Sequence, residues 1–401
     1  MGEHLDAIVI GGGILGAATA YELSKAGKKT VLLEKGAPNR EGSGTTAGNL
    51  HIQAIHTRRP GQLVAADNAR FLPLQREASK RWSFIEDELE TSVELRRSGG
   101  FMVAENEIQV EELRAKHELE KRNGLTSHFL SGDEARVALP LLSPAVTAAV
   151  FCPEDGYANP LKVVPAYLGA AQRLGSRIHG FTSVDRISAD GGVYRVEAAN
   201  AEWLAPTVVN VTGPWIGDVA GLLGIDLDMS PVAIQMQATV RVPPLMRHLV
   251  EHIGEGLSVK QVSAGNILIG GGWPAATLDL SGRSAISLRS MFGNLELAQR
   301  ILPFLTSMRI LRAWAGPLAA TPDELPVIGE VPGFPGFFVA GGTYAFTLAP
   351  LWAEVLRDLA IGLPPAVDLS GLGPERLMNR TEEGPPSNTK RKAWLDATQL
   401  A

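Results

Sequence analysis

The sequence has little cysteine and no strong excess of one charge. Among 401 residues Cys152 is the only cysteine, which excludes an intrachain disulfide framework. One thiol also cannot hold an iron–sulfur cluster or a cysteine-based zinc site. The net charge of -6 argues against nucleic-acid binding, which needs a concentrated basic surface. A single thiol suits a reducing compartment, so we predict a cytoplasmic protein.

The sequence also lacks a long uninterrupted hydrophobic run. The most apolar stretch, from Ala7 to Ala20, contains three consecutive glycines and is shorter than the roughly 20 residues that a membrane helix needs. Glu3 and Asp6 precede it, where a signal peptide carries cations. We therefore predict neither export nor a membrane span. The hydrophobic fraction of 45% is enough for a substantial core, and the length allows two domains.

The N-terminal segment has the pattern of one βαβ unit. A buried strand is predicted from Asp6 to Ile10, a helix from Ile14 to Ala26 and a second strand from Thr30 to Leu33. Gly27 supplies a C-terminal stop for the helix. The turn between the first strand and the helix is therefore a candidate site for an anion at a helix N-terminus.

This turn carries the pattern Gly-x-Gly-x-x-Gly. Gly11 permits the tight turn, Gly13 lets the backbone approach a pyrophosphate, and Gly16 lets the helix pack close to the strand. Glu34 ends the second strand, 18 residues after Gly16, and its carboxylate can accept hydrogen bonds from both ribose hydroxyls. The unit predicts a dinucleotide with an unphosphorylated ribose. It does not choose between FAD and NAD, and a tight turn without a ligand is the alternative.

Four segments together resemble one family. They are residues 6–36, residues 42–48 (GSGTTAG), residues 208–215 (VVNVTGPW) and residues 313–350, which contain Trp314-Ala315-Gly316, Thr321-Pro322-Asp323 and Phe346-Thr347-Leu348-Ala349-Pro350. With these segments the chain, from Asp6 to about Leu363, resembles the D-amino-acid oxidase superfamily of FAD-dependent oxidoreductases, in its glycine oxidase and sarcosine oxidase branch. NAD-dependent dehydrogenases lack the last three segments.

The resemblance implies an α/β fold, with a Rossmann-like FAD-binding domain and an inserted mixed-sheet α+β substrate domain. We expect residues 1–85, 148–225 and 312–370 to form the discontinuous FAD-binding domain. Residues 86–147 and 226–311 would form the substrate-binding domain, and residues 371–401 a polar C-terminal tail.

The resemblance also implies the cofactor, FAD, held non-covalently because the cysteine that attaches the flavin in sarcosine oxidase-like members is missing. The final helix, expected to start at Pro350, would direct its positive end at the flavin. The cofactor-binding residues implied are Gly11, Gly13, Ile14, Leu15, Gly16, Glu34, Lys35, Ser43, Gly44, Thr45, Thr46, Ala47, Gly48, Val184, Thr212, Gly213, Trp215, Gly316, Gly342, Thr343, Phe346, Thr347 and Leu348. For Val184 the alternative is an ordinary core valine.

The activity implied is oxidation of the C–N bond of an amino acid or N-substituted amino acid, by hydride transfer to flavin N5 to give an imine. The catalytic candidates are His51, Lys260, Gln261 and Tyr344, and further candidates for the substrate space are Gln235, Gln237 and Trp314. A strand lysine can instead be a solvated surface residue, and Trp314 a packing residue. His51 and His56 have no acidic or cysteine ligand beside them in the sequence, so no metal is predicted.

The sequence departs from the family at the substrate carboxylate. Leu318 stands where glycine oxidase-like members have an arginine that clamps this carboxylate, and residues 341–345 lack the usual histidine and glycine pattern. These departures favour, as an alternative, the catalytic β subunit of a heteromeric opine, proline or hydroxyproline dehydrogenase that passes electrons to a partner subunit. A non-catalytic FAD-binding protein is a third possibility.

Overall fold

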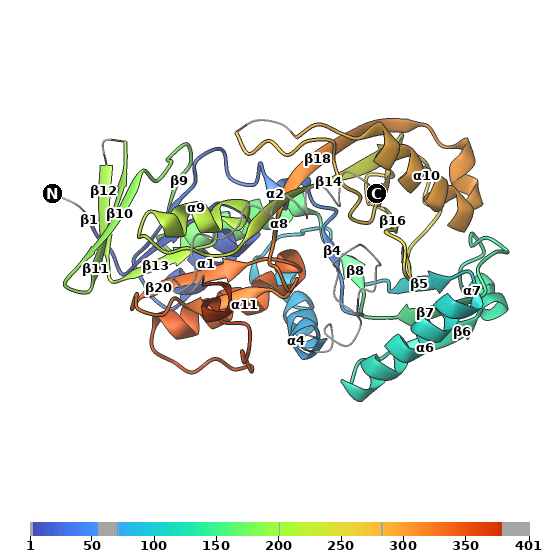
Figure 1. Ribbon diagram of the computed structural model, residues 1–401, viewed down its shortest axis with the longest axis horizontal. Helices are drawn as coiled ribbons and strands as arrows, with labels where there is room; N and C mark the ends of the chain where they lie inside the picture. The colour runs from blue at the N-terminus through green and yellow to red at the C-terminus, as the bar shows by residue number, and fades with distance from the viewer. Residues whose placement is uncertain (1–2, 55–69, 71, 200, 282–283, 379–401) are drawn as a thin grey trace, which may run out of the picture.

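The computed structural model describes residues 3–54, 70, 72–199, 201–281 and 284–378. Two large sheets lie toward opposite ends of an elongated molecule, with α1 and α11 near one sheet and α6, α7 and α10 near the other (Figure 1). This is the α/β fold expected from the sequence, a Rossmann-like sheet combined with a mixed-sheet unit.

The first large sheet contains the predicted βαβ unit. Its strand order is β19-β20-β13-β2-β3-β9, and all neighbours are parallel except β19 and β20. The strands are β2 (Ala7–Ile10), β3 (Thr30–Leu33), β9 (Arg177–His179), β13 (Thr207–Asn210), β19 (Val327–Glu330) and β20 (Phe337–Gly341). The central strands are fully buried, as is typical of parallel sheets with covered faces.

Three helices pack together beside this sheet. They are α1 (Ile14–Lys25), α8 (Pro160–Arg173) and α11 (Ala345–Ala360), and α1 contacts both of the others. Apolar side chains from α1, α8, α11 and the sheet form one core cluster. A small sheet of β1 (Glu3–His4), β12 (Ala201–Ala205), β11 (Val193–Ala198) and β10 (Arg186–Asp190) lies at this end of the molecule (Figure 1).

The second large sheet is mixed. Its order is β18-β14-β17-β16-β15-β5-β7-β6, and only β15 and β5 pair in parallel. The strands are β5 (Gly100–Ala104), β6 (His128–Ser131), β7 (Ala148–Cys152), β14 (Ser230–Thr239), β15 (Leu249–His252), β16 (Ser258–Gln261), β17 (Ile267–Gly270) and β18 (Ile310–Ala320). Helices α6 (Glu107–Arg122), α7 (Gly132–Ala138) and α10 (Leu288–Ile301) accompany it. Ser131 and Glu134 form a capping box at the start of α7.

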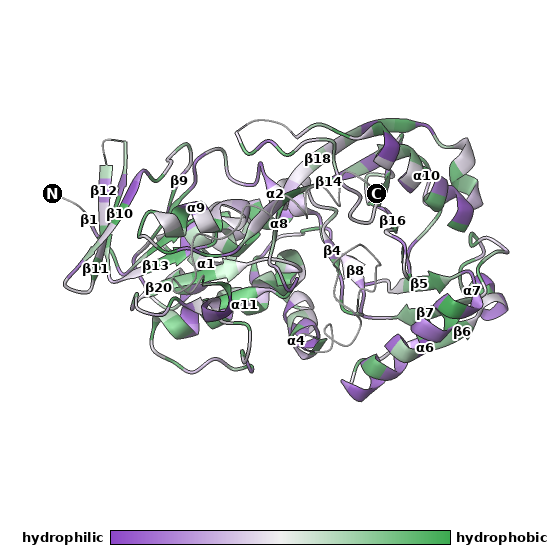
Figure 2. Cartoon of the chain, in the orientation of Figure 1, coloured by the Kyte–Doolittle hydropathy of each residue, from purple (hydrophilic) through white to green (hydrophobic). Residues whose placement is uncertain are grey.

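Shorter elements connect the two sheets. They are α2 (Gly42–Thr45), β4 (Asn49–Leu50), α4 (Leu72–Trp82), α5 (Ile85–Glu88), β8 (Gly156–Tyr157), α9 (Ile216–Gly221) and the 3-10 helices η1 (Gly213–Trp215), η2 (Pro303–Ser307) and η3 (Pro374–Leu377). Figure 2 shows that α6, at the edge of the molecule, carries both hydrophilic and hydrophobic residues. Within the described ranges, no helix has the length and hydropathy to cross a membrane.

Two domain limits from the sequence need adjustment. Strands β7 and β18 pair inside the mixed sheet, although residues from 148 and from 312 were assigned to the FAD-binding domain. We propose that these limits lie after β7 and after β18. We also propose that the polar tail starts later than residue 371, because Leu372 and Leu377 are buried and Arg376 donates to Asp323 at 2.8 Å. Residues 379–401 lie outside the described part.

Candidate active site

A cavity of about 1150 Å³ is lined by residues from both large sheets and their connections. Its walls include the glycine turn, residues from β14, Leu257 and Ser258, and residues 341–347 before and within α11. Small-molecule pockets usually measure roughly 300–1,000 Å³. The cavity therefore has room for a dinucleotide and a substrate together.

The glycine turn lies at one end of this cavity, which we call the nucleotide end. Gly11 has φ +114, and a Cβ there would lie 2.7 Å from the Val211 carbonyl oxygen. A Cβ on Gly16 would lie only 1.8 Å from the Gly11 carbonyl oxygen, so α1 packs against the turn as closely as predicted. A Cβ on Gly13 would lie 2.9 Å from Ser43 Oγ. Only glycine leaves this surface of the turn open.

Polar groups around the turn suit the ADP half of FAD. The Glu34 carboxylate lines the cavity and accepts hydrogen bonds from Gly12 N at 2.7 Å and Gly36 N at 2.8 Å. Ser43 Oγ accepts from Ile14 N at 2.9 Å, at the start of α1. A carboxylate beside the ribose position and free space at a helix N-terminus are the features that a dinucleotide needs.

Two cations also line the nucleotide end. Lys35 Nζ lies 3.2 Å from the centre of the Trp215 ring, and burial lowers the pKa of Lys35 despite the nearby Glu41 carboxylate. Arg40 is the second cation, and the sequence interpretation missed it. Its position between the second strand and the Ser43-Gly44 pair was the available signal.

The N-terminal turn of α11 also lines the cavity. Residues 341–347 all contribute, and the first turn of this 16-residue helix holds no acidic side chain. The N-terminal end of α11, where the helix dipole is positive, therefore borders the cavity. The predicted start at Pro350 is wrong, since the helix begins at Ala345 and Pro350 is buried inside it. A single missing N–H does not end a helix whose other residues are held by packing.

Most of the predicted cofactor residues line the cavity. They are Gly11, Gly13, Ile14, Leu15, Glu34, Lys35, Ser43, Thr46, Ala47, Val184, Thr212, Gly213, Trp215, Gly342, Thr343, Phe346 and Thr347, together with His51 and Tyr344. The lining does not include Gly16, Gly44, Thr45, Gly48, Gly316, Leu348, Lys260 or Gln261. Several of these are glycines that permit close backbone contact, such as Gly316, where a Cβ would lie 1.9 Å from Thr45 Oγ1.

Lys260 is buried behind the cavity wall, and its hydrogen bonds hold residues of that wall in place. Its Nζ donates to the Ala47 carbonyl at 2.5 Å and to Asn49 Oδ1 at 2.6 Å, and lies over the Tyr157 ring. Burial holds the pKa of Lys260 well below its usual range. The alternative of a solvated surface lysine is wrong, because its exposed fraction is 1%. Its contacts position the segment before β4 and give it no direct contact with the cavity.

Gln261 also holds a loop. Its Oε1 accepts from Leu245 N and Met246 N, and its Nε2 donates to three carbonyl groups, one of them that of Pro243 at 2.9 Å. All of its amide groups are used within the protein. These contacts give Gln261 a structural role, and they leave no group free for a substrate.

The other substrate candidates differ in position. Gln235 lines the cavity, but its amide exchanges hydrogen bonds with the Ser287 backbone at 2.8 and 3.1 Å and so fixes the start of α10. Trp314 Nε1 donates to the Thr45 carbonyl at 2.8 Å, which supports the packing alternative. Gln237 is buried outside the lining. Leu318 lines the cavity, so the position where the family has its arginine presents an apolar side chain.

At the other end, which we call the substrate end, His51 meets a carboxylate that the sequence did not reveal. His51 Nδ1 lies 3.0 Å from Glu251 Oε1, and the His51 ring contacts the Tyr344 ring edge-on. Burial lowers the pKa of His51, but Glu251 outweighs this and the net shift is upward. His51 N donates to Thr347 Oγ1 at 3.1 Å, which ties the histidine to α11. His56 lies outside the described residues.

A buried polar network supports the substrate end from behind. Asp155 accepts from Ile52 N at 2.8 Å and Gln53 N at 3.1 Å, and burial together with the Glu251 charge raises its pKa to about 6. Gln53 Oε1 accepts from Lys116 Nζ at 2.8 Å, and Lys116 pairs with Glu120. The network fixes the backbone directly after His51. No local sequence pattern indicates this network, because its members come from distant segments of the chain.

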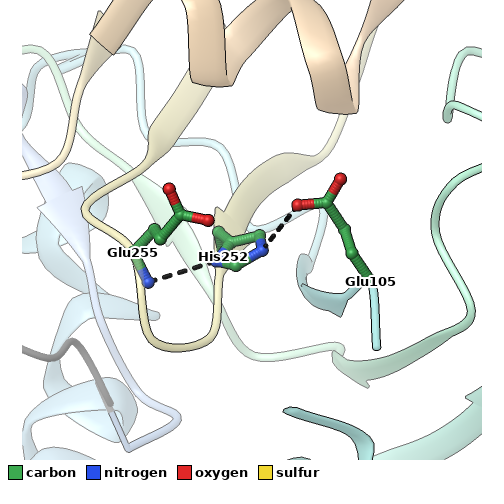
Figure 3. Close-up of side chains that lie close together, drawn as sticks. All are labelled: Glu105, His252 and Glu255. Carbon is green, nitrogen blue, oxygen red and sulfur yellow. Dashed lines mark hydrogen bonds and ion pairs between the residues drawn. The ribbon is translucent and has the colours of Figure 1, made fainter. Parts of the chain in front are cut away.

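A second cluster, away from the cavity, consists of Glu105, His252 and Glu255 (Figure 3). The buried His252 ring accepts from Glu255 N at 3.2 Å through Nδ1, and its Nε2 lies 3.2 Å from Glu105 Oε2. Arg300 Nε contacts both Glu105 oxygens. Both ring nitrogens are therefore used within the protein, and any cation would compete with Arg300. The cluster ties β5 and β15 to α10.

Comparison with known proteins agrees with this geometry. The fold contains a Rossmann-type unit whose glycine turn, acidic ribose partner and helix N-terminus border a large cavity. These features are typical of a dinucleotide-dependent enzyme. Residues 6–359 match the DAO family, described as FAD dependent oxidoreductase. The chain belongs to this family and is an FAD-dependent oxidoreductase.

Individual relatives share this length and fold. The glycine oxidase of Geobacillus kaustophilus is 25% identical over 374 residues, covering 92% of this chain and 96% of the relative. One opine oxidase subunit, from Rhizobium meliloti, is 24% identical over 351 residues, covering 86% and 90%. The crystal structure of Geobacillus kaustophilus glycine oxidase aligns with a TM-score of 0.83 at 24% identity, over 95% of this chain and 100% of that one. The inserted mixed-sheet architecture is therefore that of glycine oxidase.

Proposed function

We propose that this enzyme oxidises the C–N bond of an amino acid or an N-substituted amino acid to an imine. The observation that carries this proposal is the cavity that joins the glycine turn and Glu34 to a second space beside His51, Glu251 and Tyr344. Bound FAD would supply the acceptor for the hydride from the substrate C–H.

The residues of the chain would position the reactants. Glu34, Ser43 and the start of α1 would hold the ADP half, and the N-terminal turn of α11 would face the flavin with its positive end. Tyr344 and His51 would orient the substrate amine. Glu251, whose Oε1 lies 3.0 Å from His51 Nδ1, would keep the His51 ring in one orientation. Positioning of this kind is the main demand of hydride transfer.

Product analysis tests this proposal. The purified protein loaded with FAD is incubated with an artificial electron acceptor and a panel of amino acids, N-methyl amino acids and opines. A substrate should yield a carbonyl compound and an amine in equal amounts, because water hydrolyses the imine. Reduction of the acceptor without any carbonyl product would contradict C–N oxidation.

As an alternative, we propose that the chain is the catalytic β subunit of a heteromeric dehydrogenase that passes electrons to a partner subunit. The similarity to the Rhizobium meliloti opine oxidase chain favours this interpretation, and so does the apolar Leu318 in the cavity wall. The compartment proposed with either function is the cytoplasm, since Cys152 is buried and free.

The rate at which the reduced enzyme is reoxidised by different acceptors distinguishes a single-chain oxidase from a subunit of a heteromeric dehydrogenase. A dehydrogenase subunit should return electrons to an artificial acceptor much faster than to oxygen, and it should form a defined complex with the proteins encoded beside it. A single chain that makes peroxide at its full catalytic rate would contradict the heteromeric alternative.

A further inference from the structure

The substrate end of the cavity contains a buried carboxylate with one oxygen unpaired. Glu251 is 4% exposed and lines the cavity. Its Oε1 contacts His51, whereas its Oε2 is buried and has no hydrogen-bond partner among the described residues. Leaving a buried carboxylate oxygen unpaired is costly. A cationic donor in the cavity would remove this cost.

The surroundings of Glu251 hold a second buried carboxylate, and the nearby Lys260 is engaged elsewhere. Asp155 lies close enough for the Glu251 charge to raise its pKa. Lys260 directs its Nζ to Ala47 and Asn49. The described residues that line the cavity include one lysine, Lys35, and one arginine, Arg40. Both belong to the segment that follows β3, at the nucleotide end.

We propose that Glu251, held by His51, binds a second cationic group of the substrate, an ammonium or guanidinium that does not react. This deepens the proposed function and rests on it. The substrate class would be basic amino acids or their N-substituted derivatives.

The bound cation must differ from the nitrogen that is oxidised. Hydride leaves the carbon beside a neutral amine, and a carboxylate in contact with that amine would favour its protonated, unreactive form. A side-chain guanidinium or ammonium stays charged and gives Glu251 Oε2 a charge-assisted hydrogen bond. Glu251 is therefore a specificity residue, and it takes no part in the transfer itself.

The test compares two amino acids that differ only in this charge. L-arginine and L-citrulline, and their D-isomers, are titrated anaerobically into the FAD-loaded protein, and binding is followed by the perturbation of the visible flavin spectrum. An arginine isomer should bind at least about tenfold more tightly than the matching citrulline, as expected for a hydrogen bond to a charged group. Lysine and norleucine form a second pair with the same expectation.

The variant Glu251→Gln should reduce this preference to less than about threefold. It keeps the shape of the side chain and removes the charge that makes the hydrogen bond strong. The matched control Glu296→Gln makes the same chemical change at an exposed position of α10 and should keep the preference. If Glu251→Gln fails to fold, the wild-type pairs still decide the question.

Equal binding within both pairs, no binding of any cationic member, or an unchanged preference in Glu251→Gln would overturn the proposal. These results leave the proposed function standing if other amines reduce the flavin. A protein that does not retain FAD would instead contradict the proposed function itself.

Discussion

At the scale of single residues, the Glu34 carboxylate is held by two backbone N–H groups at the nucleotide end. Its two oxygens accept from Gly12 N and Gly36 N, so the carboxylate is already oriented before it meets a ribose. A carboxylate fixed in this way contributes more to binding than a mobile one, because less freedom is lost when the ligand binds.

Glu34→Gln should weaken FAD binding by about 10- to 100-fold, which corresponds to the roughly 1.5–3 kcal/mol of a hydrogen bond to a charged group. Titration of the apoprotein with FAD, followed by flavin fluorescence, measures the change. Glu296→Gln serves as the control and should bind FAD like the wild type. An unchanged affinity in Glu34→Gln would show that the carboxylate does not meet the ribose.

Gly16→Ala should destabilise the protein by about 1–3 kcal/mol, the usual cost of overpacking, because its Cβ would lie 1.8 Å from a backbone oxygen. Gly169→Ala in α8 is the matched control. The nearest atom there is Arg173 Nη1 at 3.8 Å, and alanine should stabilise the helix by about 0.5–1 kcal/mol. Urea unfolding of both variants measures the difference, and equal stabilities would contradict the close packing of α1.

Local rules predicted some residues well and others not at all. The glycine turn and Glu34 were accessible because each depends on neighbours in the sequence. Glu251 was not, since its burial depends on the pairing of β15 with β16 and on contact with His51, 200 residues earlier in the chain. A charged residue in a short strand gives no local sign that it is buried.

At the scale of elements, α6 is joined to the active-site wall by a buried ion pair. Lys116 and Glu120 are fully buried, and they contact Gln53 and the Ala54 backbone, which lie just after His51 in the chain. Helix α6 is rich in charged residues, and two of these charges are therefore buried. The pair fixes the helix against this segment.

Lys116→Met should lower the free energy of unfolding by about 3–5 kcal/mol, because it leaves the Glu120 charge buried without its partner. Lys121→Met on the same helix is the control. It removes an exposed pair with Glu118 at 3.3 Å and should cost less than about 1 kcal/mol. Denaturant unfolding of the two variants measures both. Similar small effects would indicate that the buried pair is hydrated in solution.

Element boundaries show where sequence rules compete. The start of α11 was predicted at Pro350 because proline favours a first helical turn, yet the helix begins at Ala345. The apolar stretch from Ala201 to Asn210 is divided into β12 and β13, which belong to different sheets. Pro206, which lies between them, cannot donate a ladder hydrogen bond.

At the scale of the whole molecule, the cavity has walls from both large sheets. A ligand that fills its nucleotide end would contact β2, α1, residues 211–215 after β13 and residues of the segment 34–47, so its binding energy would add to the stability of the fold. The family resemblance supplied this architecture, whereas composition and periodicity alone gave only one βαβ unit. The pairing of β7 and β18 into the mixed sheet was not readable from local patterns.

FAD should therefore stabilise the protein against unfolding. At a free concentration of about 100 times its Kd, the gain is about 2.7 kcal/mol, measured as a rise in Tm during thermal unfolding. FMN lacks the adenosine monophosphate part of FAD, including the ribose that Glu34 is expected to hold, so it should raise Tm much less. Equal effects of the two flavins would contradict the assignment of the nucleotide end.

Anaerobic reduction of the bound flavin tests the central claim most directly. The FAD-loaded protein is mixed, without oxygen, with each member of a panel of amino acids, N-substituted amino acids and opines, and its visible spectrum is recorded. We predict that at least one of these amines bleaches the flavin absorption fully. A flavin that stays oxidised with every amine, yet is reduced by a hydroxy acid or another substrate without a C–N bond to oxidise, would contradict the account.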